Sequence, residues 1–291
     1  MSEPFVACLC PTYNRLPGLV ENSIACFRAQ TYPADRRRLI VLDDSGKRPP
    51  QRGDGWQVIA TPTRYPSLAA KYNAMAALAI DDGAEVLVVW EDDDIYLPWH
   101  IDSHVRTLWD SQWSLSLAQW SLYPGYLIQE VKEGPSKTAY AWHGAMAFTR
   151  EAFEQTGGWP ETGEGTFDQQ FVARMRGYSP RGDPAADCTF YRGWSDSDDG
   201  PKFNVHTGSG DTSKVTPVPL DLTRRYLEPG YVYRWGSTGN HHGESFMRSP
   251  DDHTWYESFA VAQNKLVGST VHGPIVPKLD SETERVLVQL S

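Results

Sequence analysis

The chain has 291 residues, of which 40% are hydrophobic and 22% charged, with a formal net charge of −10. These are ordinary values for a globular protein, and the length suits one large domain or a domain with an appendage. The acidic balance argues against a duplex-binding protein, which presents a basic face to phosphates, although a local basic groove stays open.

The cysteines and the N-terminus favour a cytoplasmic protein. Four cysteines occur without a CxxC pair, which predicts buried thiols in a reducing compartment rather than a zinc site or a redox motif. No basic segment followed by an apolar stretch, as in a signal peptide, opens the chain. The longest strongly apolar run, Val86 to Trp90, is too short to span a bilayer, so no transmembrane segment is expected.

Strand-like and helix-like segments alternate along the first half of the chain. Short apolar runs predict buried strands, and longer segments with one apolar side predict helices. The strands are expected at residues 5–10, 39–42, 56–60 and 86–90, and the helices at 16–30 and 68–80. This alternation predicts an α/β fold with a mostly parallel sheet flanked by helices.

The second half of the chain is less regular. Aromatic, strand-like pieces occur over residues 113–131, and helices are expected at 150–156 and 167–175. Beyond about residue 177 Gly, Pro, Asp and Ser dominate, and residues 193–213 have the composition of a long loop. Residues 215–291 contain aromatic clusters without an interpretable pattern.

Polar residues follow three of the predicted strands. In parallel sheets ligands bind beyond the carboxyl ends of the strands, so these three segments are expected to form a site. The segments are Pro11-Thr12-Tyr13-Asn14-Arg15, Asp43-Asp44-Ser45 and Glu91-Asp92-Asp93-Asp94.

The acidic segments indicate a metal and a nucleotide. Four consecutive carboxylates repel one another, and Mg²⁺ or Mn²⁺ removes that repulsion and can bridge to a phosphate. A solvated acidic turn is the alternative. Asp43 and Asp44 suit the imide of a base or the hydroxyls of a ribose, with an N-cap or Asx turn before Ser45 as the alternative.

Taken in order, these motifs resemble the family 2 glycosyltransferases of the GT-A fold. Pro98 follows the second acidic segment as in that family, and Lys71 and Asn73 resemble its Arg/Lys-x-Asn segment. Residues 148–159, from Phe-Thr-Arg to Gly-Gly-Trp, resemble the stretch before the acceptor-side helix. Residues 168–174 resemble the helix that the family opens with Glu-Asp, although Phe167 stands in the place of the glutamate. The resemblance covers about residues 5–178.

The resemblance implies a role for each motif. Asp92 and Asp94 correspond to the DxD motif that holds a metal on the diphosphate, and a histidine such as His206 often completes that site. Asp168 matches the catalytic base, with Glu164 one helical turn earlier as its substitute. The residues expected to bind the nucleotide sugar are Pro11, Thr12, Tyr13, Arg15, Asp43, Asp44, Lys71, Asn73, Asp92 and Asp93.

Aromatic and histidine residues outside these motifs are interpreted separately. Trp142, His143 and Trp159 are candidates for a wall that faces the acceptor, with buried aromatic packing as the alternative. The alternative interpretation of His206 is a loop histidine that does not complete the metal site. His100 and His104, one turn apart, are expected to pack rather than bind zinc. His241 and His242 lie in a Gly-rich loop and are expected to be structural or exposed.

The predicted activity is metal-dependent transfer of a sugar, with inversion, from a nucleotide sugar to an acceptor hydroxyl. The expected cofactor is Mn²⁺ or Mg²⁺, a UDP-sugar is favoured, and the acceptor is a glycan, a lipid carrier, a protein or a modified nucleic acid. Residues 1–214 would form the GT-A catalytic domain, with a nucleotide-binding half at about 1–110 and an acceptor half at about 111–214. Residues 215–291 would form an extension of unknown role.

Two other functions compete with this one. A nucleotidyltransferase shares the sheet and the acidic site, but it usually carries a Gly-rich basic loop after the first strand, and residues 11–15 contain no glycine. A non-catalytic nucleotide-sugar-binding protein is the other alternative, and the intact acidic segment and Asp168 argue against it.

Overall fold

The computed structural model describes residues 3–15, 18–116, 118–123, 126–131, 143–161, 166–185 and 230–234. The chain divides into two compact units, one formed by Met1–Leu117 with Tyr140–Ala186 and one by Ala118–Ala139 with Asp187–Ser291. The predicted boundary at residue 214 lies outside the described residues and stays a prediction.

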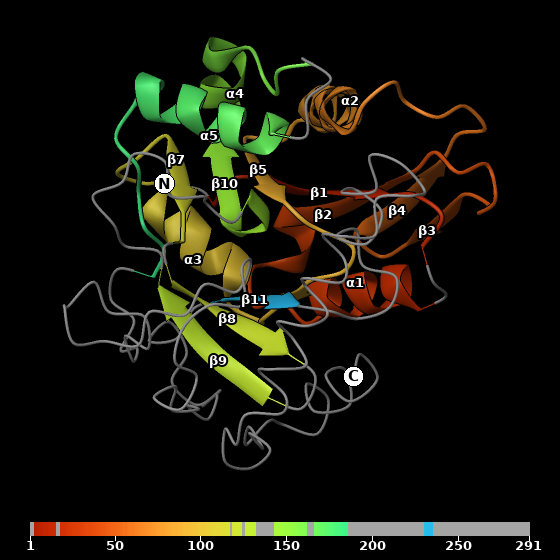
Figure 1. The fold of residues 1–291 in the computed structure, drawn as a ribbon, viewed down its shortest axis with the longest axis horizontal. Coiled ribbons are helices and arrows are strands. Elements are labelled where there is room, and N and C mark those ends of the chain that lie inside the picture. The colour runs from red at the N-terminus through yellow and green to blue at the C-terminus, as the bar shows by residue number, and fades with distance from the viewer. Residues whose placement is uncertain are drawn as a thin grey trace, which may run out of the picture. The chain divides into compact units, whose positions relative to one another are not determined.

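A seven-stranded sheet forms the centre of the first unit, in the order β3-β4-β2-β1-β5-β10-β7 (Figure 1). The four strands β4, β2, β1 and β5 are parallel, while β3 and β10 pair antiparallel with their neighbours. The strands are β1 (Val6–Thr12), β2 (Arg37–Asp43), β3 (Gln51–Gly53), β4 (Trp56–Ala60), β5 (Val86–Val89), β7 (Trp113–Leu115) and β10 (Met146–Thr149).

Helices cover both faces of this sheet. Figure 1 shows α2, α4 and α5 on one face and α1 and α3 on the other. The helices are α1 (Leu19–Arg28), α2 (Leu68–Asp81), α3 (His100–Thr107), α4 (Arg150–Thr156) and α5 (Phe167–Tyr178). Two short 3₁₀ turns, η1 (Ala34–Arg36) and η2 (His143–Ala145), and a two-residue strand, β6 (Ile95–Tyr96), lie between the larger elements. The predicted α/β class, with a mostly parallel sheet flanked by helices, is therefore confirmed.

The alternation of side chains in β1 builds both layers of the core. Ala7 and Leu9 belong to the cluster that packs against α2, α4 and α5. Cys8 and Cys10 point to the opposite face, as successive residues of a strand must, and Cys10 Sγ lies 3.6 Å from Ser23 Oγ of α1. All seven residues of β1 are buried, so the strand that carries the first site loop is fixed on both faces.

Four strands were not predicted from the sequence, and one of them is the two-residue strand β6. All three residues of β3 are exposed, so no apolar pattern marks it. The run Met-Ala-Phe-Thr of β10 is apolar but continues directly into α4, without a turn residue to separate the two elements. The remaining one, β11 (Tyr231–Arg234), lies in the stretch where no pattern was interpretable.

The second unit contains a small sheet in its described part. The strand β8 (Ala118–Tyr123) pairs antiparallel with β9 (Tyr126–Val131) and parallel with β11. The strand-like pieces expected over residues 113–131 are thus β7, β8 and β9. Over all the ranges that the structure describes, we find no helix long and apolar enough to cross a membrane.

His100 and His104 are buried on α3, as the packing interpretation predicted. Their rings contact each other edge to face at 4.6 Å between centroids, and His104 Nδ1 lies 2.6 Å from Ser114 Oγ. Burial lowers the pKa of His104 to about 3, because the charged imidazolium would lose its solvation. His104 is therefore a neutral core residue.

We expect His104 to make folding sensitive to acid. Its pKa is about 3 when folded and 6.5 in the reference state, so the unfolded chain binds more protons between these values. The free energy of unfolding should fall as the pH falls from 6.5 towards 3. His104→Gln removes the titrating group, so urea denaturation over this range should show a shallower dependence on pH. An unchanged slope in the variant would contradict this assignment.

Candidate functional site

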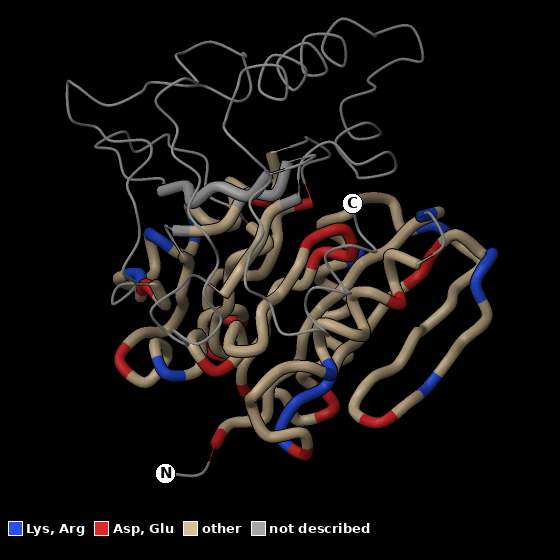
Figure 2. Tube along the Cα trace, turned by 90° about the horizontal axis from the view of Figure 1, so that it is seen from below, with Lys and Arg blue, Asp and Glu red and all other residues tan. Residues whose placement is uncertain are grey.

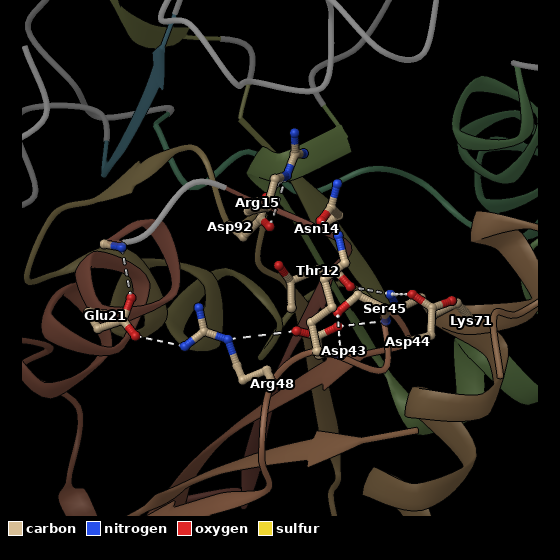
Figure 3. A network of polar contacts seen from close by, with 12 residues as sticks. Thr12, Asn14, Arg15, Glu21, Asp43, Asp44, Ser45, Arg48, Lys71 and Asp92 are labelled. Atoms are coloured by element: carbon tan, nitrogen blue, oxygen red, sulfur yellow. Dashed lines mark hydrogen bonds and ion pairs between the residues drawn. The ribbon is translucent and has the colours of Figure 1, made fainter. Parts of the chain in front are cut away.

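The loops after three adjacent parallel strands meet at one edge of the sheet. Because β1 lies between β2 and β5, residues 12–15, 43–48 and 91–94 come together there, as the sequence predicted. Figure 3 shows the polar network that they form with the start of α2. Pro11 and Thr12 extend β1 by two residues beyond its predicted end and pair with Leu42 and Asp43.

Arg15 binds the acidic segment that follows β5. Its Nε lies 3.1 Å from both carboxylate oxygens of Asp92, and a terminal nitrogen lies 3.4 Å from Asp93 Oδ2. Asp92, Asp93 and Asp94 are all buried. Burial, followed by the charge of Asp93, raises the pKa of Asp92 to about 6, and Arg15 opposes that shift. The repulsion among these carboxylates is thus relieved here by a guanidinium.

The donor set of the acidic segment fits a divalent cation in part. Mg²⁺ is usually bound through one or two carboxylates together with substrate phosphates and waters, rather than by a complete cage of protein ligands. Asp92 and Asp94 supply carboxylates of this kind. Within the described ranges no three His, Cys, Asp or Glu side chains are grouped as a complete metal site. His206 lies outside those ranges, and its role as a ligand stays a prediction.

Lys71 joins the loops after β1 and β2. Its Nζ donates to Asp44 Oδ1 and to the carbonyl oxygen of Thr12, both at 2.5 Å. Asp44 Oδ2 accepts the backbone N–H of Tyr65 at 2.9 Å. Burial lowers the pKa of Lys71, while the hydrogen bond and charge of Asp44 raise it. Both oxygens of Asp44 are therefore engaged within the protein, and its role in nucleotide binding stays a prediction.

Asp43 forms the Asx turn that was the alternative to a nucleotide contact. Its Oδ1 accepts the backbone N–H of Ser45 at 2.7 Å, and its Oδ2 lies 3.6 Å from Arg48 Nε. Arg48 also donates to Glu21 at 2.7 Å. The turn and a ligand contact are compatible, because a carboxylate offers about four lone-pair sites.

The loop after β1 holds a strained residue and a stacked pair. Asn14 is the one non-glycine residue with positive φ (49°) among the described ranges, and Lys47 donates to its side chain at 2.5 Å. Asparagine tolerates this left-handed conformation better than most residues. The guanidinium of Arg64 lies 3.8 Å from the centroid of the Tyr13 ring. Three cations contact carboxylates of these loops: Arg15, Arg48 and Lys71.

A second network lies on the other side of Asp92. Tyr72 donates to Glu91 Oε1 at 2.8 Å, and His143 Nδ1 lies 3.2 Å from the same oxygen. Trp159 Nε1 donates to His143 Nε2 at 2.8 Å. The Asn73 side chain exchanges two hydrogen bonds of 2.9 Å with the backbone of Trp159. His143 and Trp159 are buried, so both belong to a packed cluster, and their predicted contact with an acceptor stays a prediction.

The predicted base, Asp168, lies in the first turn of α5. It is half-buried, and its Oδ2 accepts a hydrogen bond from Gln169 at 2.9 Å. The preceding Phe167 contacts the rings of His143 and Tyr72, with centroids 5.9 and 6.3 Å away. Glu164 and Trp142 lie outside the described residues. The sequence identified Glu91 only as part of the acidic segment and did not identify Tyr72, because nothing in the local pattern predicts their contact with residue 143.

Positive and negative residues are mixed over the rest of the described chain. Figure 2 shows Lys and Arg positions interspersed with Asp and Glu positions along the tube. The three consecutive arginines 36–38 illustrate this, because Arg36 and Arg38 pair with Glu85 and Asp82, and Arg37 donates to backbone carbonyls in the core. The described part of the chain therefore offers no extended basic face for a duplex.

Comparison with known proteins gives weak structural matches only. No family model and no curated protein sequence matches the chain. Among solved structures, the mannosyltransferase PcManGT from Pyrobaculum calidifontis in complex with GDP-Man and Mn²⁺ has a TM-score of 0.44 at 20% identity, covering 60% of this chain and 52% of that one. S. aureus TarS in complex with UDP-GlcNAc has a TM-score of 0.45 at 13% identity, covering 98% of this chain and 71% of that one. The chain spans about half the length of the first of these proteins.

We expect the buried pair of Lys71 and Asp44 to be required for stability. Lys71→Met leaves a buried carboxylate without its cation, which typically costs about 3–5 kcal/mol in free energy of unfolding. The double variant Lys71→Met/Asp44→Asn removes the unpaired charge and should recover much of that loss. Urea denaturation of the wild type, both single variants and the double variant measures the coupling. Additive losses would contradict a direct interaction.

Proposed function

We propose that the protein transfers a sugar from a nucleotide-activated donor to an acceptor hydroxyl, as the resemblance to GT-A glycosyltransferases suggests. The observation that carries the proposal is the pairing of acidic and basic side chains at one sheet edge. Asp92 with Arg15, and Asp44 with Lys71, come from loops after adjacent parallel strands. Such an edge suits a ligand that carries both phosphates and hydroxyls.

Each part of the site suits one part of a nucleotide sugar. The ring of Tyr13 and the carboxylate of Asp43 suit a base and its ribose. A UDP-sugar is favoured because uracil and ribose can both donate hydrogen bonds to carboxylates. The guanidinium of Arg15 suits the diphosphate, to which it can donate in bidentate fashion. A divalent cation on Asp92 and Asp94 would supply Lewis-acid stabilisation of the departing diphosphate.

In the proposed reaction the acceptor oxygen attacks the anomeric carbon. The bond from that carbon to the diphosphate oxygen breaks, and Asp168 takes the proton of the acceptor hydroxyl. A single displacement inverts the anomeric configuration.

Nucleotide binding is the first test of this function. With Mn²⁺ present, UDP should raise the melting temperature more than GDP or CDP, since a ligand at about 100 times its Kd adds about 2.7 kcal/mol to the stability of the native state. Asp92→Asn and Asp94→Asn should lose most of the Mn²⁺-dependent shift, whereas Asp110→Asn, an exposed control, should keep it. Tighter binding of GDP, or a shift unaffected by EDTA, would contradict the proposed donor or the proposed metal.

Replacement of the proposed base tests the chemical step. Asp168→Asn keeps the size and hydrogen bonding of the side chain but cannot take a proton, so transfer should fall by about 10²–10⁴. Binding of UDP should be unchanged, which calorimetry can verify. Normal transfer by Asp168→Asn together with loss of transfer in Glu164→Gln would identify Glu164 as the base.

A further inference from the structure

Four side chains form a chain of hydrogen bonds that ends on the carboxylate of Glu91. Trp159 Nε1 donates to His143 Nε2, and His143 Nδ1 lies within hydrogen-bond distance of Glu91 Oε1. Tyr72 donates to the same carboxylate oxygen. These residues come from four separate segments of the chain, so the contacts depend on the tertiary fold rather than on local sequence.

The hydrogen bond from Trp159 determines which nitrogen of His143 carries the ring proton. An indole nitrogen is a donor only, so the Nε2 atom that it faces at 2.8 Å must accept the bond. A neutral imidazole has one donor and one acceptor nitrogen, and Nδ1 therefore carries the ring proton. That N–H points at Glu91 Oε1, 3.2 Å away, as a donor to a carboxylate should.

Tyr72 adds a second donor to the same oxygen. Burial, with the nearby charge of Glu91, raises the pKa of Tyr72 well above its usual value, so the hydroxyl keeps its proton and donates it. The backbone of Glu91 is also held, because its N–H donates to the Tyr96 hydroxyl at 2.6 Å. Two donors and a fixed backbone give the carboxylate one orientation.

Glu91 has the most exposed side chain of this network. The side chain of Glu91 is 19% exposed and that of His143 is 6% exposed. Tyr72 and Trp159 are buried at 0% and 1%. A buried framework that holds one accessible carboxylate is the arrangement of a binding residue with its supporting shell.

Glu91 is connected through its neighbours to both ends of the proposed site. Its neighbour Asp92 contacts Arg15 on the side of the β1 loop, where a diphosphate would bind. The partner of Glu91, His143, contacts Phe167, which directly precedes Asp168. A sugar attached to the diphosphate and approached by a base at Asp168 would therefore lie beside Glu91.

We propose that the carboxylate of Glu91 accepts a hydrogen bond from a hydroxyl of the donor's sugar ring, and that His143 and Tyr72 are positioning residues for it. This inference rests on the proposed function and extends it by naming the residue that recognises the sugar part of the donor. Carboxylates accept hydroxyl hydrogen bonds more strongly than neutral groups do. Recognition of this kind distinguishes the nucleotide sugar from the bare nucleotide.

Calorimetry with Mn²⁺ tests the proposal, using UDP, UDP-glucose and UDP-GlcNAc as probes. For the UDP-sugar that the wild type binds best, Glu91→Gln should weaken binding about tenfold, because a charged acceptor becomes a neutral one. The Kd for UDP should stay within about twofold of the wild-type value, since UDP has no sugar ring for residue 91 to contact. The matched control is Glu154→Gln, the same change on the exposed face of α4, and it should alter neither constant.

Variants of the supporting residues separate positioning from packing. His143→Phe removes the donor to Glu91 and should weaken UDP-sugar binding but not UDP binding. His143→Asn retains a side-chain N–H near the place of Nδ1 and should restore part of the loss. Tyr72→Phe keeps the ring and should cause a smaller, few-fold loss, as expected for one hydrogen bond. If Glu91→Gln does not fold, these variants still test whether Glu91 contacts the sugar of the donor.

Three outcomes would overturn the proposal. Equal weakening of UDP and UDP-sugar by Glu91→Gln would mean that residue 91 acts on the nucleotide or on the fold. Unchanged binding of both ligands would mean that Glu91 does not contact the sugar. In both cases the proposed function survives, because the wild type still binds nucleotide. If the wild type binds neither UDP nor a UDP-sugar, the proposed function fails and the role of Glu91 fails with it.

Discussion

The first two turns of α2 hold the site together. Three consecutive residues bond to different parts of the chain: Lys71 to Thr12 and Asp44, Tyr72 to Glu91, and Asn73 to the backbone of Trp159. Successive helical residues are about 100° apart around the axis, so the three side chains point in three directions. The Ser67 hydroxyl oxygen accepts the backbone N–H of Ala70, so Ser67 caps the N-terminus of the helix. These two turns thereby fix the loops after β1, β2 and β5 and the segment after α4.

The buried charges explain why these turns must be so well held. Asp44 and Asp92 are buried, and a buried carboxylate is costly unless a cation pairs with it. Lys71 and Arg15 fill that requirement from within the chain. An anionic ligand would compete with Asp92 for Arg15, and a divalent cation would compete with Arg15 for Asp92. If both bind, the Arg15–Asp92 ion pair is replaced by contacts of Arg15 with the anion and of Asp92 with the cation. Neither side chain is then left as an unpaired charge.

The sequence predicted the parts of the fold that local patterns determine. The parallel strands appear as short, mainly apolar runs, so β1, β2, β4 and β5 were predicted, and with them the loops that carry Arg15, Asp44 and Asp92. The exposed β3 and the short β10, which continues into α4, have no such signal. The pairing of Glu91 with His143 was not predictable either, because 52 residues separate them and only the packing of η2 beside β5 brings them together. His143 and Trp159 form a buried framework with Glu91, and their expected contact with an acceptor stays a prediction.

The aromatic residue at position 167 belongs to that framework. A glutamate there, as the resemblance would have it, would place a charge against the rings of Tyr72 and His143 and lose solvation. Phe167 packs against both rings instead and anchors the start of α5. Asp168 is one residue further and about 100° around the helix, and it is half-buried. Phe167 supplies no carboxylate to the proposed reaction. It fixes the helix that carries Asp168 to the same rings that hold Glu91, so that the two carboxylates keep one geometry.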